Sequence, residues 1–374
     1  MKRSTNVTKL LVLSLSLLLV LTIWMGCQKG TKMPTAPEQN QAVVLNKANP
    51  VIRSIMAVQE RHTPELLARA DVVGTAVGVT EEGELALKVY TKSIALKKSL
   101  GIPETIEGVR VVVEVVGEIR PMKGRPPAPS DVDHQAKQTP PIQLGTSGGW
   151  RYDLANGYCC GGTLGSLIQI GTTKYILSNY HVLEADIVAG GNNRVAQTGD
   201  PVIQPGLIDV GCDANEAQDV ATLVKKSSLP NSNVDCAIAE IIQGMVDESG
   251  AILEIGTISS QTVEAYIGQA VKKSGRTTGL TRSSVSGLNA TIQVTYDDEC
   301  AGNTAFTKIF YGQIVVKNRG SKFLAGGDSG SLMVEDVTTN PRAVGLLFAG
   351  SNTTAIANPI DEVLSFLNAT MVGN

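Results

Sequence analysis

The feature that most constrains the fold of this chain is a long series of short β-like runs. Between Ile142 and the C-terminus, apolar and β-branched segments of four to seven residues alternate with turns rich in Gly and Asn. Many short strands at this spacing favour a closed all-β architecture. The expected strands cover 166–170, 175–178, 220–225, 237–242, 271–274, 290–296, 313–317, 331–335 and 343–349, and a terminal helix is expected over 361–367.

The first 26 residues have the pattern of an export signal peptide. Three basic residues precede a 16-residue run without an ionisable group, from Leu10 to Met25. As a helix, this run would span about 24 Å, short of the roughly 30 Å hydrocarbon core of a membrane. Cys27 follows a glycine, as at a bacterial lipoprotein cleavage site, so we expect lipid anchoring at Cys27; an uncleaved anchor or ordinary secretion stays open. Residues 27–41 are polar with two prolines and predict a flexible tether.

Residues 42–120 predict a small α+β accessory domain. Asn49 followed by Pro50 is typical of a helix N-cap with proline in the first turn, and an apolar stripe follows it. No catalytic motif is visible in this segment, and His62 is expected at an exposed helix end. The expected strands of the domain cover 72–79, 84–91 and 107–118.

Six prolines crowd residues 121–141. Proline lacks a backbone N–H and favours extended backbone, so this stretch cannot join a sheet or a helix interior. We therefore expect a proline-rich linker at 121–141, with His134 exposed to solvent, ahead of a second domain over 142–374.

Charge and composition exclude several function classes. The formal net charge is −3, and loss of the three basic residues of the leader would leave −6, so nucleic acid is not an expected partner. Three histidines and the absence of a Cys-x-x-Cys pair leave little for a zinc site. Residues 272–280 (KKSGRTTGL) lack the Gly-Lys-Ser/Thr ending of a phosphate loop and predict a strand with its turn. We expect neither a metal nor another cofactor.

Three motifs within 142–374 carry chemistry. A hydrophobic run leads into His181, Asp235 stands at the start of a buried run, and Ser329 lies in a glycine-flanked loop, Gly-Asp-Ser-Gly-Ser. These residues follow one another at separations of 54 and 94 positions, and His181 is the only histidine after residue 141. A serine hydroxyl becomes a good nucleophile when an imidazole removes its proton, and a buried carboxylate keeps the imidazole oriented.

The segment from about Tyr158 to Leu367 resembles the chymotrypsin/trypsin family of serine peptidases, in particular its bacterial members. Gly-Asp-Ser-Gly-Ser is the most specific part, and Cys160-Gly-Gly-Thr-Leu-Gly-Ser resembles the family's strand ahead of the histidine. The resemblance implies two six-stranded antiparallel β-barrels with a C-terminal helix, here preceded by the small α+β domain. It also implies a serine endopeptidase that cleaves protein or peptide substrates through a covalent acyl-enzyme.

The resemblance assigns roles position by position. Ser329 becomes the nucleophile, His181 the general base and acid, and Asp235 the orienting carboxylate. The backbone N–H groups of Gly327 and Ser329 become the oxyanion hole, which stabilises the developing negative charge. Asp219 precedes a similar apolar run and stays an alternative to Asp235, which the resemblance favours.

The resemblance also suggests substrate contacts. Phe323 lies six positions before the serine, where many relatives set their side-chain preference, and no acid stands there to favour Lys or Arg. The strand ending in Phe348, Ala349 and Gly350 is expected to pair with substrate by its edge. An apolar or small substrate side chain would suit these residues.

Asp328 matches an acid that, in relatives activated by proteolysis, pairs with a newly cut N-terminal amine. No activation site precedes Ile142. A buried carboxylate still needs partners, so we expect side-chain or backbone donors around Asp328 and a site formed without cleavage.

The cysteines indicate an exported protein with few disulfides. Cys159 and Cys160 are adjacent, and the geometry of a disulfide disfavours a bond between them. Cys212 or Cys300 is expected to pair with one of them. Cys236 is expected to be a buried, free thiol.

The leading interpretation is an exported serine endopeptidase of the cell envelope, held at the membrane by a lipid anchor, or else secreted or periplasmic. Two other functions stay open. One is a protease-like binding or scaffold protein that is catalytically silent. The other is a serine esterase or acyl transferase that uses the same triad. The sequence does not define the oligomeric state.

Overall fold

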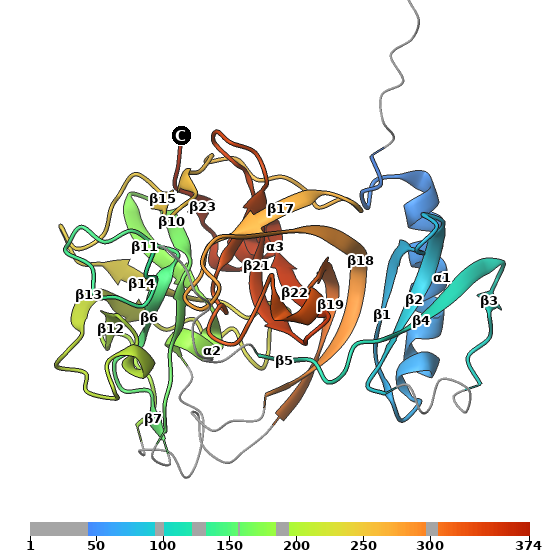
Figure 1. The fold of residues 1–374 in the computed structure, drawn as a ribbon, viewed down its shortest axis with the longest axis horizontal. Coiled ribbons are helices and arrows are strands. Elements are labelled where there is room, and N and C mark those ends of the chain that lie inside the picture. The colour runs from blue at the N-terminus through green and yellow to red at the C-terminus, as the bar shows by residue number, and fades with distance from the viewer. Residues whose placement is uncertain (1–43, 94–100, 122–131, 156–157, 185–193, 297–305) are drawn as a thin grey trace, which may run out of the picture. The chain divides into compact units, whose positions relative to one another are not determined.

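The structure is a computed structural model that describes residues 44–93, 101–121, 132–155, 158–184, 194–296 and 306–374. The expected signal peptide, the tether with Cys27, and Cys300 lie outside the described residues. Within the described part of the chain, no helix is long and apolar enough to cross a membrane. Residues 44–374 form one unit, which Figure 1 shows as a largely β-structured body.

A closed six-stranded barrel, the second barrel, occupies the C-terminal part of the chain. Its strands follow the order β17-β20-β21-β22-β19-β18, and β18 pairs back with β17 to complete the ring. All six pairings are antiparallel. The barrel, orange to red in Figure 1, consists of β17 (Ala270–Lys273), β18 (Thr281–Tyr296), β19 (Phe306–Lys317), β20 (Leu332–Glu335), β21 (Ala343–Gly350) and β22 (Thr354–Pro359).

The first barrel precedes it in the chain and closes in the same way. Gly165 lies between β9 and β10, and its N–H donates to Leu177 O at 3.0 Å, so β9 and β10 act as one bent strand. With that strand, six strands form the ring β6-β9/β10-β11-β14-β13-β12. They are β6 (Thr146–Trp150), β9 (Gly162–Leu164), β10 (Ser166–Ile170), β11 (Thr173–Ser178), β12 (Pro201–Gln204), β13 (Gln218–Val224) and β14 (Ala237–Ile241). The two rings confirm the predicted all-β class.

Short elements lie between and after the barrel strands. Helix α3 (Ile360–Leu367) follows β22 and is the predicted C-terminal helix, with its apolar face buried. After it, β23 (Thr370–Met371) pairs with β10 and returns the chain to the first barrel. The remaining short elements are α2 (Tyr180–Leu183), the 3₁₀ turns η1 (Leu207–Asp209) and η2 (Arg319–Ser321), and strands β7 (Leu154–Ala155), β8 (Tyr158–Cys159), β15 (Ala251–Ile252) and β16 (Gly256–Thr257).

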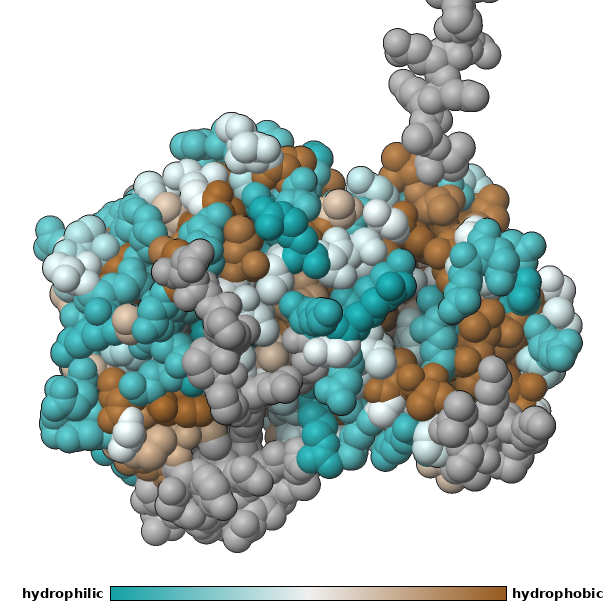
Figure 2. Space-filling view, viewed as in Figure 1, coloured by the Kyte–Doolittle hydropathy of each residue, from teal (hydrophilic) through white to brown (hydrophobic). Residues whose placement is uncertain are grey.

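The N-terminal segment, residues 44–121, has the predicted helix and strands. The Asn49 side chain accepts hydrogen bonds from Val51 N and Ile52 N, at 2.9 and 3.4 Å, and so caps the helix as expected. Figure 2 shows hydrophobic residues reaching the surface over this part of the molecule. Its elements are α1 (Pro50–Leu67), β1 (Val72–Val79), β2 (Leu85–Thr91), β3 (Thr105–Ile106), β4 (Val109–Val115) and β5 (Arg120–Pro121).

This segment is not separate from the barrels, which differs from the expected accessory domain. Strand β1 pairs antiparallel with β18, so β1, β2, β4 and β3 extend the sheet of the second barrel, and β5, which pairs with β21, completes its eleven strands. Ile52 and Ile55 of α1 belong to the same buried cluster as Val285 and Leu288 of β18. The physical reason is the length of β18, whose 16 residues provide a free edge for a further strand.

The described part of the expected linker is also packed. His134 is 3% exposed, although the sequence predicted a solvated side chain. Its Nδ1 lies 2.8 Å from Gly145 O and its Nε2 lies 2.6 Å from Glu254 Oε2. The partner carboxylate lies 120 positions away in sequence, so no local pattern could reveal it.

One predicted pairing of cysteines is confirmed. Cys159 and Cys212 form a disulfide with a Cα–Cα distance of 5.5 Å. Cys236 is free and fully buried, also as predicted. The disulfide fixes the loop that carries η1 against β8.

Candidate active site

His181 and Asp235 meet in the first barrel because β11 and β14 are neighbours. Ser178, at the end of β11, pairs with Ala237 at the start of β14. His181 shortly follows Ser178 and Asp235 shortly precedes Ala237, so the two residues lie at the same end of this strand pair. His181 Nδ1 lies 2.7 Å from Asp235 Oδ2. The two side chains are 4% and 0% exposed, so this polar pair is removed from water.

Four further hydrogen bonds fix Asp235. Its backbone N–H donates to Asn358 Oδ1 at 2.9 Å, and its carbonyl accepts from Asn179 Nδ2 at 2.7 Å. Its carboxylate accepts from the backbone N–H of His181 at 3.4 Å and from the hydroxyl of Tyr296 at 2.7 Å. A fully buried carboxylate requires such donors to stay ionised.

The alternative carboxylate, Asp219, lies elsewhere. It is on β13, its side chain is 45% exposed, and it forms an ion pair with Arg151 at 2.8 Å. The structure therefore brings Asp235, and not Asp219, to the histidine.

Ser329 lies in the loop that leads into β20, and this loop packs against β9 of the first barrel. Ser329 O accepts from Thr163 N at 2.8 Å, and its Oγ donates to Phe348 O at 3.2 Å. A methyl group placed on Gly162 would meet both Ser329 O and Val182, so the serine and the residue after His181 adjoin the same glycine. His181 Nε2 is buried and has no hydrogen-bond partner among the described residues.

Asp328 has the donors that the sequence predicted. Its carboxylate accepts from the backbone N–H groups of Thr277, Thr278 and Ala325 at 2.9 to 3.1 Å and from the Thr278 hydroxyl at 2.7 Å. Lys273 Nζ lies 3.4 Å away, and both side chains are 0% exposed. Burial lowers the pKa of Lys273, and the charge of Asp328 opposes this shift. The buried carboxylate is thus satisfied without a chain terminus.

The backbone beside Ser329 is held by threonine hydroxyls. Thr163 Oγ1 donates to Gly327 O at 2.9 Å, and Thr277 Oγ1 donates to Gly326 O at 2.6 Å. Because a trans peptide group is planar, the Gly327 N–H points away from the Thr277 hydroxyl. Gly327 has φ +99°, and a methyl group there would lie 2.7 Å from Arg276 Nη1, so glycine is required.

A buried ion pair lies next to this glycine. The Arg276 guanidinium donates to both carboxylate oxygens of Asp209, with Nε 2.6 Å from Oδ2, and the two side chains are 3% and 5% exposed. Asp209 belongs to η1 of the first barrel, and Arg276 belongs to the turn after β17 of the second. Ser147 Oγ adds a hydrogen bond to Asp209. The pair joins the two barrels beside the serine loop.

Strand β21, which the sequence predicted to bind substrate, pairs with another strand of the same chain, β5. Strand β5 lies antiparallel to the end of β21, with Pro121 opposite Ala349 and Arg120 opposite Gly350. The preceding residue, Ile119, is fully buried, and its carbonyl accepts from Thr295 N at 3.2 Å. The edge of β21 is therefore covered next to Phe348.

The expected specificity residues divide into two groups. Phe348, Ala349 and Gly350 lie on β21 next to the serine, although the Phe348 side chain is fully buried in a core cluster. Phe323 is 2% exposed and belongs to the core of the second barrel, so its side chain does not offer a binding surface. The position six residues before Ser329 predicted a binding surface at Phe323, but the Phe323 N–H donates to Asn318 Oδ1 after the turn η2. This hydrogen bond holds the backbone in a conformation in which the Phe323 side chain is buried.

Sequence reasoning missed three partners of the site. Lys273 and Thr278, which surround Asp328, lie in the KKSGRTTGL stretch that predicted only a strand and its turn. The need of a buried Asp328 for a cation was the signal that could have found them. Tyr296, the partner of Asp235, ends a β-like run and carried no signal of its own.

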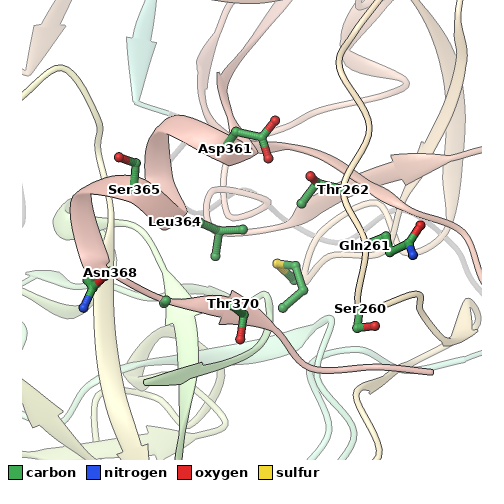
Figure 3. Close-up of a pocket in the computed structure, with 10 residues that line it drawn as sticks. Ser260, Gln261, Thr262, Asp361, Leu364, Ser365, Asn368 and Thr370 are labelled. Atoms are coloured by element: carbon green, nitrogen blue, oxygen red, sulfur yellow. The ribbon is translucent and has the colours of Figure 1, made fainter. Parts of the chain in front are cut away.

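A shallow hollow of about 600 Å³ lies away from these residues. Figure 3 shows it between α3 and the segment that carries Ser260, Gln261 and Thr262. None of His181, Asp235 and Ser329 lines it. The hollow is thus separate from the candidate active site.

This chain is similar to known proteins over part of its length. Streptogrisin-A of Streptomyces griseus is 35% identical over 113 residues, which are 29% of this chain and 32% of streptogrisin-A, so the match spans about a third of that relative. A family model described as the Nal1 C-terminal domain matches residues 229–358.

Two solved structures are similar to part of this chain. A glutamic-acid-specific serine protease that uses a histidine triad in substrate binding is 19% identical, with a TM-score of 0.40, over 62% of this chain and 100% of its own. Protease A of Thermobifida fusca is 18% identical, with a TM-score of 0.40, over 62% of this chain and 99% of its own.

Proposed function

This chain has the trypsin/chymotrypsin-like fold and resembles serine proteases at low identity, and on that premise we propose that it is a serine endopeptidase. The observation that carries the proposal is the buried contact between His181 and Asp235. The imidazole Nε2, on the ring edge away from the carboxylate, has no hydrogen-bond partner in the described part of the chain. Ser329 lies in the adjoining loop and is the nucleophile of the proposed reaction.

The proposed reaction runs in two halves. Ser329 Oγ attacks the carbonyl carbon of the substrate while His181 Nε2 takes the hydroxyl proton, and Asp235 stabilises the imidazolium that forms. The N–H groups of Gly327 and Ser329 donate to the oxyanion of the tetrahedral intermediate. His181 then gives its proton to the leaving amine, which breaks the peptide bond and leaves an acyl-enzyme. Water, activated by the same imidazole, hydrolyses the ester.

In the structure, β5 covers the edge of β21 to which a substrate of the proposed enzyme would pair. A peptide that pairs with β21 must displace β5, because Arg120 and Pro121 already occupy the edge at Ala349 and Gly350. Substrate access then depends on how readily the end of the N-terminal segment detaches. The proposed location is the cell envelope, with a lipid anchor at Cys27, which rests on the basic and apolar leader.

One observation favours a second candidate, a protease-like binding protein without activity. The Ser329 hydroxyl donates to Phe348 O, and no hydrogen bond joins it to His181 Nε2 within the described residues. Catalytic hydrogen bonds of this type are often long before substrate binds, so the observation does not decide between the two functions.

A fluorophosphonate probe on the full chain decides between them. The probe is expected to label the wild type and to leave Ser329→Ala unlabelled. Ser166→Ala is the matched control, because the Ser166 hydroxyl is also buried but has no hydrogen-bond partner among the described residues. No labelling of the wild type, or equal labelling of all three proteins, would reject the serine-hydrolase proposal. Cleavage of casein or a peptide library then separates a peptidase from an esterase.

A further inference from the structure

Tyr296 occupies an unusual place for a core tyrosine. It ends the described part of β18, it is 4% exposed, and its ring stacks on Phe306 with a centroid distance of 4.7 Å. Its ring also meets the His181 imidazole edge to face at 6.1 Å. Its hydroxyl lies 2.7 Å from Asp235 Oδ2, the oxygen that also binds His181 Nδ1.

We propose that Tyr296 is a positioning residue of the His181–Asp235 pair: its hydroxyl fixes the carboxylate rotation that aims Oδ2 at the imidazole. This inference rests on the proposed function, because it concerns the same site. Tyr296 belongs to the second barrel and Asp235 to the first, so the pair is completed by a side chain from across the barrel junction.

The carboxylate has few other constraints. Oδ1 accepts one long hydrogen bond, at 3.4 Å, from the backbone of His181. Oδ2 accepts from His181 Nδ1 and from Tyr296, which approach the same atom. Without the hydroxyl, Oδ2 keeps the imidazole as its one donor among the described residues, and the carboxylate is freer to rotate about its Cβ–Cγ bond.

The protonation states suit this role. Burial, and then the charge of Asp235, raise the pKa of Tyr296 well above its ordinary value, so the hydroxyl stays a donor throughout the range in which histidine titrates. The neighbouring thiol of Cys236 is buried, which raises its pKa well above its ordinary value, so it adds no charge beside Asp235. The groups that respond to the loss of the hydroxyl are therefore Asp235 and His181.

A second tyrosine shows that the hydrogen bond is not a general consequence of packing. Tyr90 belongs to the same buried cluster as Tyr296, and it is fully buried. Its hydroxyl has no hydrogen-bond partner among the described residues. Tyr90→Phe thus removes a buried hydroxyl of the same cluster without removing a hydrogen bond, which makes it a matched control.

The end of β18 is itself held in place. Tyr296 pairs with Phe306 across the β18–β19 hairpin, and the preceding residue, Thr295, donates its N–H to Ile119 O. These backbone contacts fix the position of Tyr296 and therefore the place from which its ring projects. The hydroxyl is the part of the residue that reaches the first barrel.

The experiment compares Tyr296→Phe with Tyr90→Phe in the full chain. For Tyr296→Phe we expect kcat to fall roughly 10- to 100-fold with little change in KM, as for loss of a hydrogen bond to a buried charged group. The acid limb of kcat/KM is expected to move to higher pH, because a carboxylate that has lost a donor holds the imidazolium more strongly. Tyr90→Phe is expected to keep the wild-type values.

Two further measurements isolate the route through Asp235. The low-field proton NMR resonance of His181 Nδ1–H is expected to move in Tyr296→Phe and to stay in Tyr90→Phe. In an Asp235→Asn background, Tyr296→Phe is expected to cost less than about threefold in kcat, because both changes act through one carboxylate. The pH limb and the resonance would not move for a residue that only supports packing.

The outcomes separate the two proposals. An active wild type with an unmoved acid limb and an unmoved resonance in Tyr296→Phe overturns the positioning role and leaves the peptidase proposal in place. A wild type that neither turns over substrate nor reacts with the probe overturns the peptidase proposal. The resonance then still tests the positioning role, because it reports the His181–Asp235 contact without turnover.

Discussion

The two barrels have the same strand number but different surroundings. The first barrel, which carries His181 and Asp235, closes through its own strands, and among the described residues its sheet gains the short C-terminal β23. The second barrel, which carries Ser329 and β21, is extended by four strands of the N-terminal segment and covered by β5. The comparison teaches that the N-terminal segment acts on the half that would bind substrate, while the histidine–carboxylate pair lies in the other half.

The largest expected effect on kcat comes from substitutions of one residue in each barrel. His181→Ala in the first barrel and Ser329→Ala in the second are each expected to lower kcat by about 10⁶, and the double variant to lower it no further. Residues that act as one unit are not additive in their effects. Single-turnover kinetics with a peptide ester checks this, and additive losses would show that the barrels contribute independently.

The next effect concerns the first barrel alone. Asp235→Asn is expected to lower kcat by about 10⁴ with the fold intact, because the imidazole then has the wrong tautomer. Asp219→Asn is the matched control and is expected to stay near wild type, since Asp219 pairs with Arg151 on the surface. Steady-state kinetics and circular dichroism measure both; a comparable loss in Asp219→Asn would contradict the assignment.

A smaller effect is expected where the N-terminal segment covers the second barrel. Ile119→Ala removes a fully buried side chain that holds β5 in place, and it is expected to raise kcat/KM for a peptide about tenfold by raising the population of the uncovered form. Labelling by a small fluorophosphonate should change less, because the probe does not pair with β21.

Arg110→Ala serves as the control for this variant. Arg110 lies on β4 of the same segment, and it forms an exposed ion pair with Glu84. It is expected to leave kcat/KM unchanged. A fall in kcat/KM for Ile119→Ala would mean that β5 supports the site instead of covering it.

The smallest effect is expected on the far side of the N-terminal segment. Arg61 and His62 hold the pKa of Glu107 at about 2, below its ordinary value of 4.5, and this carboxylate is exposed. A lowered pKa in the folded state means that the contribution to stability is present above pH 4.5 and disappears as pH falls toward 2.

Glu107→Gln should therefore lower the midpoint of thermal unfolding slightly at pH 7 and by a smaller amount at pH 2. Differential scanning calorimetry at the two pH values measures this. An equal shift at both values would show that the charge of Glu107 is not the cause.

Much of this molecule follows from local patterns. Most of the strands expected from β-branched runs lie within three residues of an observed strand, and Asn49-Pro50 marked the start of α1. Strands β18 and β19 begin well before the expected 290 and 313, and β6, β9, β12 and β22 lie outside the expected ranges. The motifs around His181 and Asp235 predicted the contact between these two residues, because residue order and strand context agreed, and the role of Ser329 stays a prediction. Local sequence is sufficient where a neighbouring strand supplies the partner.

What local patterns missed depends on distant partners. The joining of the N-terminal segment to the second barrel requires β1 to meet β18, more than 200 residues later. The burial of His134 depends on Glu254, and the hydroxyl of Tyr296 finds its partner in the other barrel. Phe323 was predicted to contact substrate from its distance along the chain to Ser329. That distance does not fix the direction of the side chain, which points into the core.

The ion pair between Arg276 and Asp209 has a mechanical consequence. Any rotation of one barrel against the other would separate a guanidinium from a carboxylate in a region that water scarcely reaches, at a cost of several kcal/mol. The ion pair is thus expected to keep the two barrels in one relative orientation beside the serine loop. In the proposed peptidase, a substrate strand would therefore reach β21 by displacing β5, without a rotation of one barrel against the other.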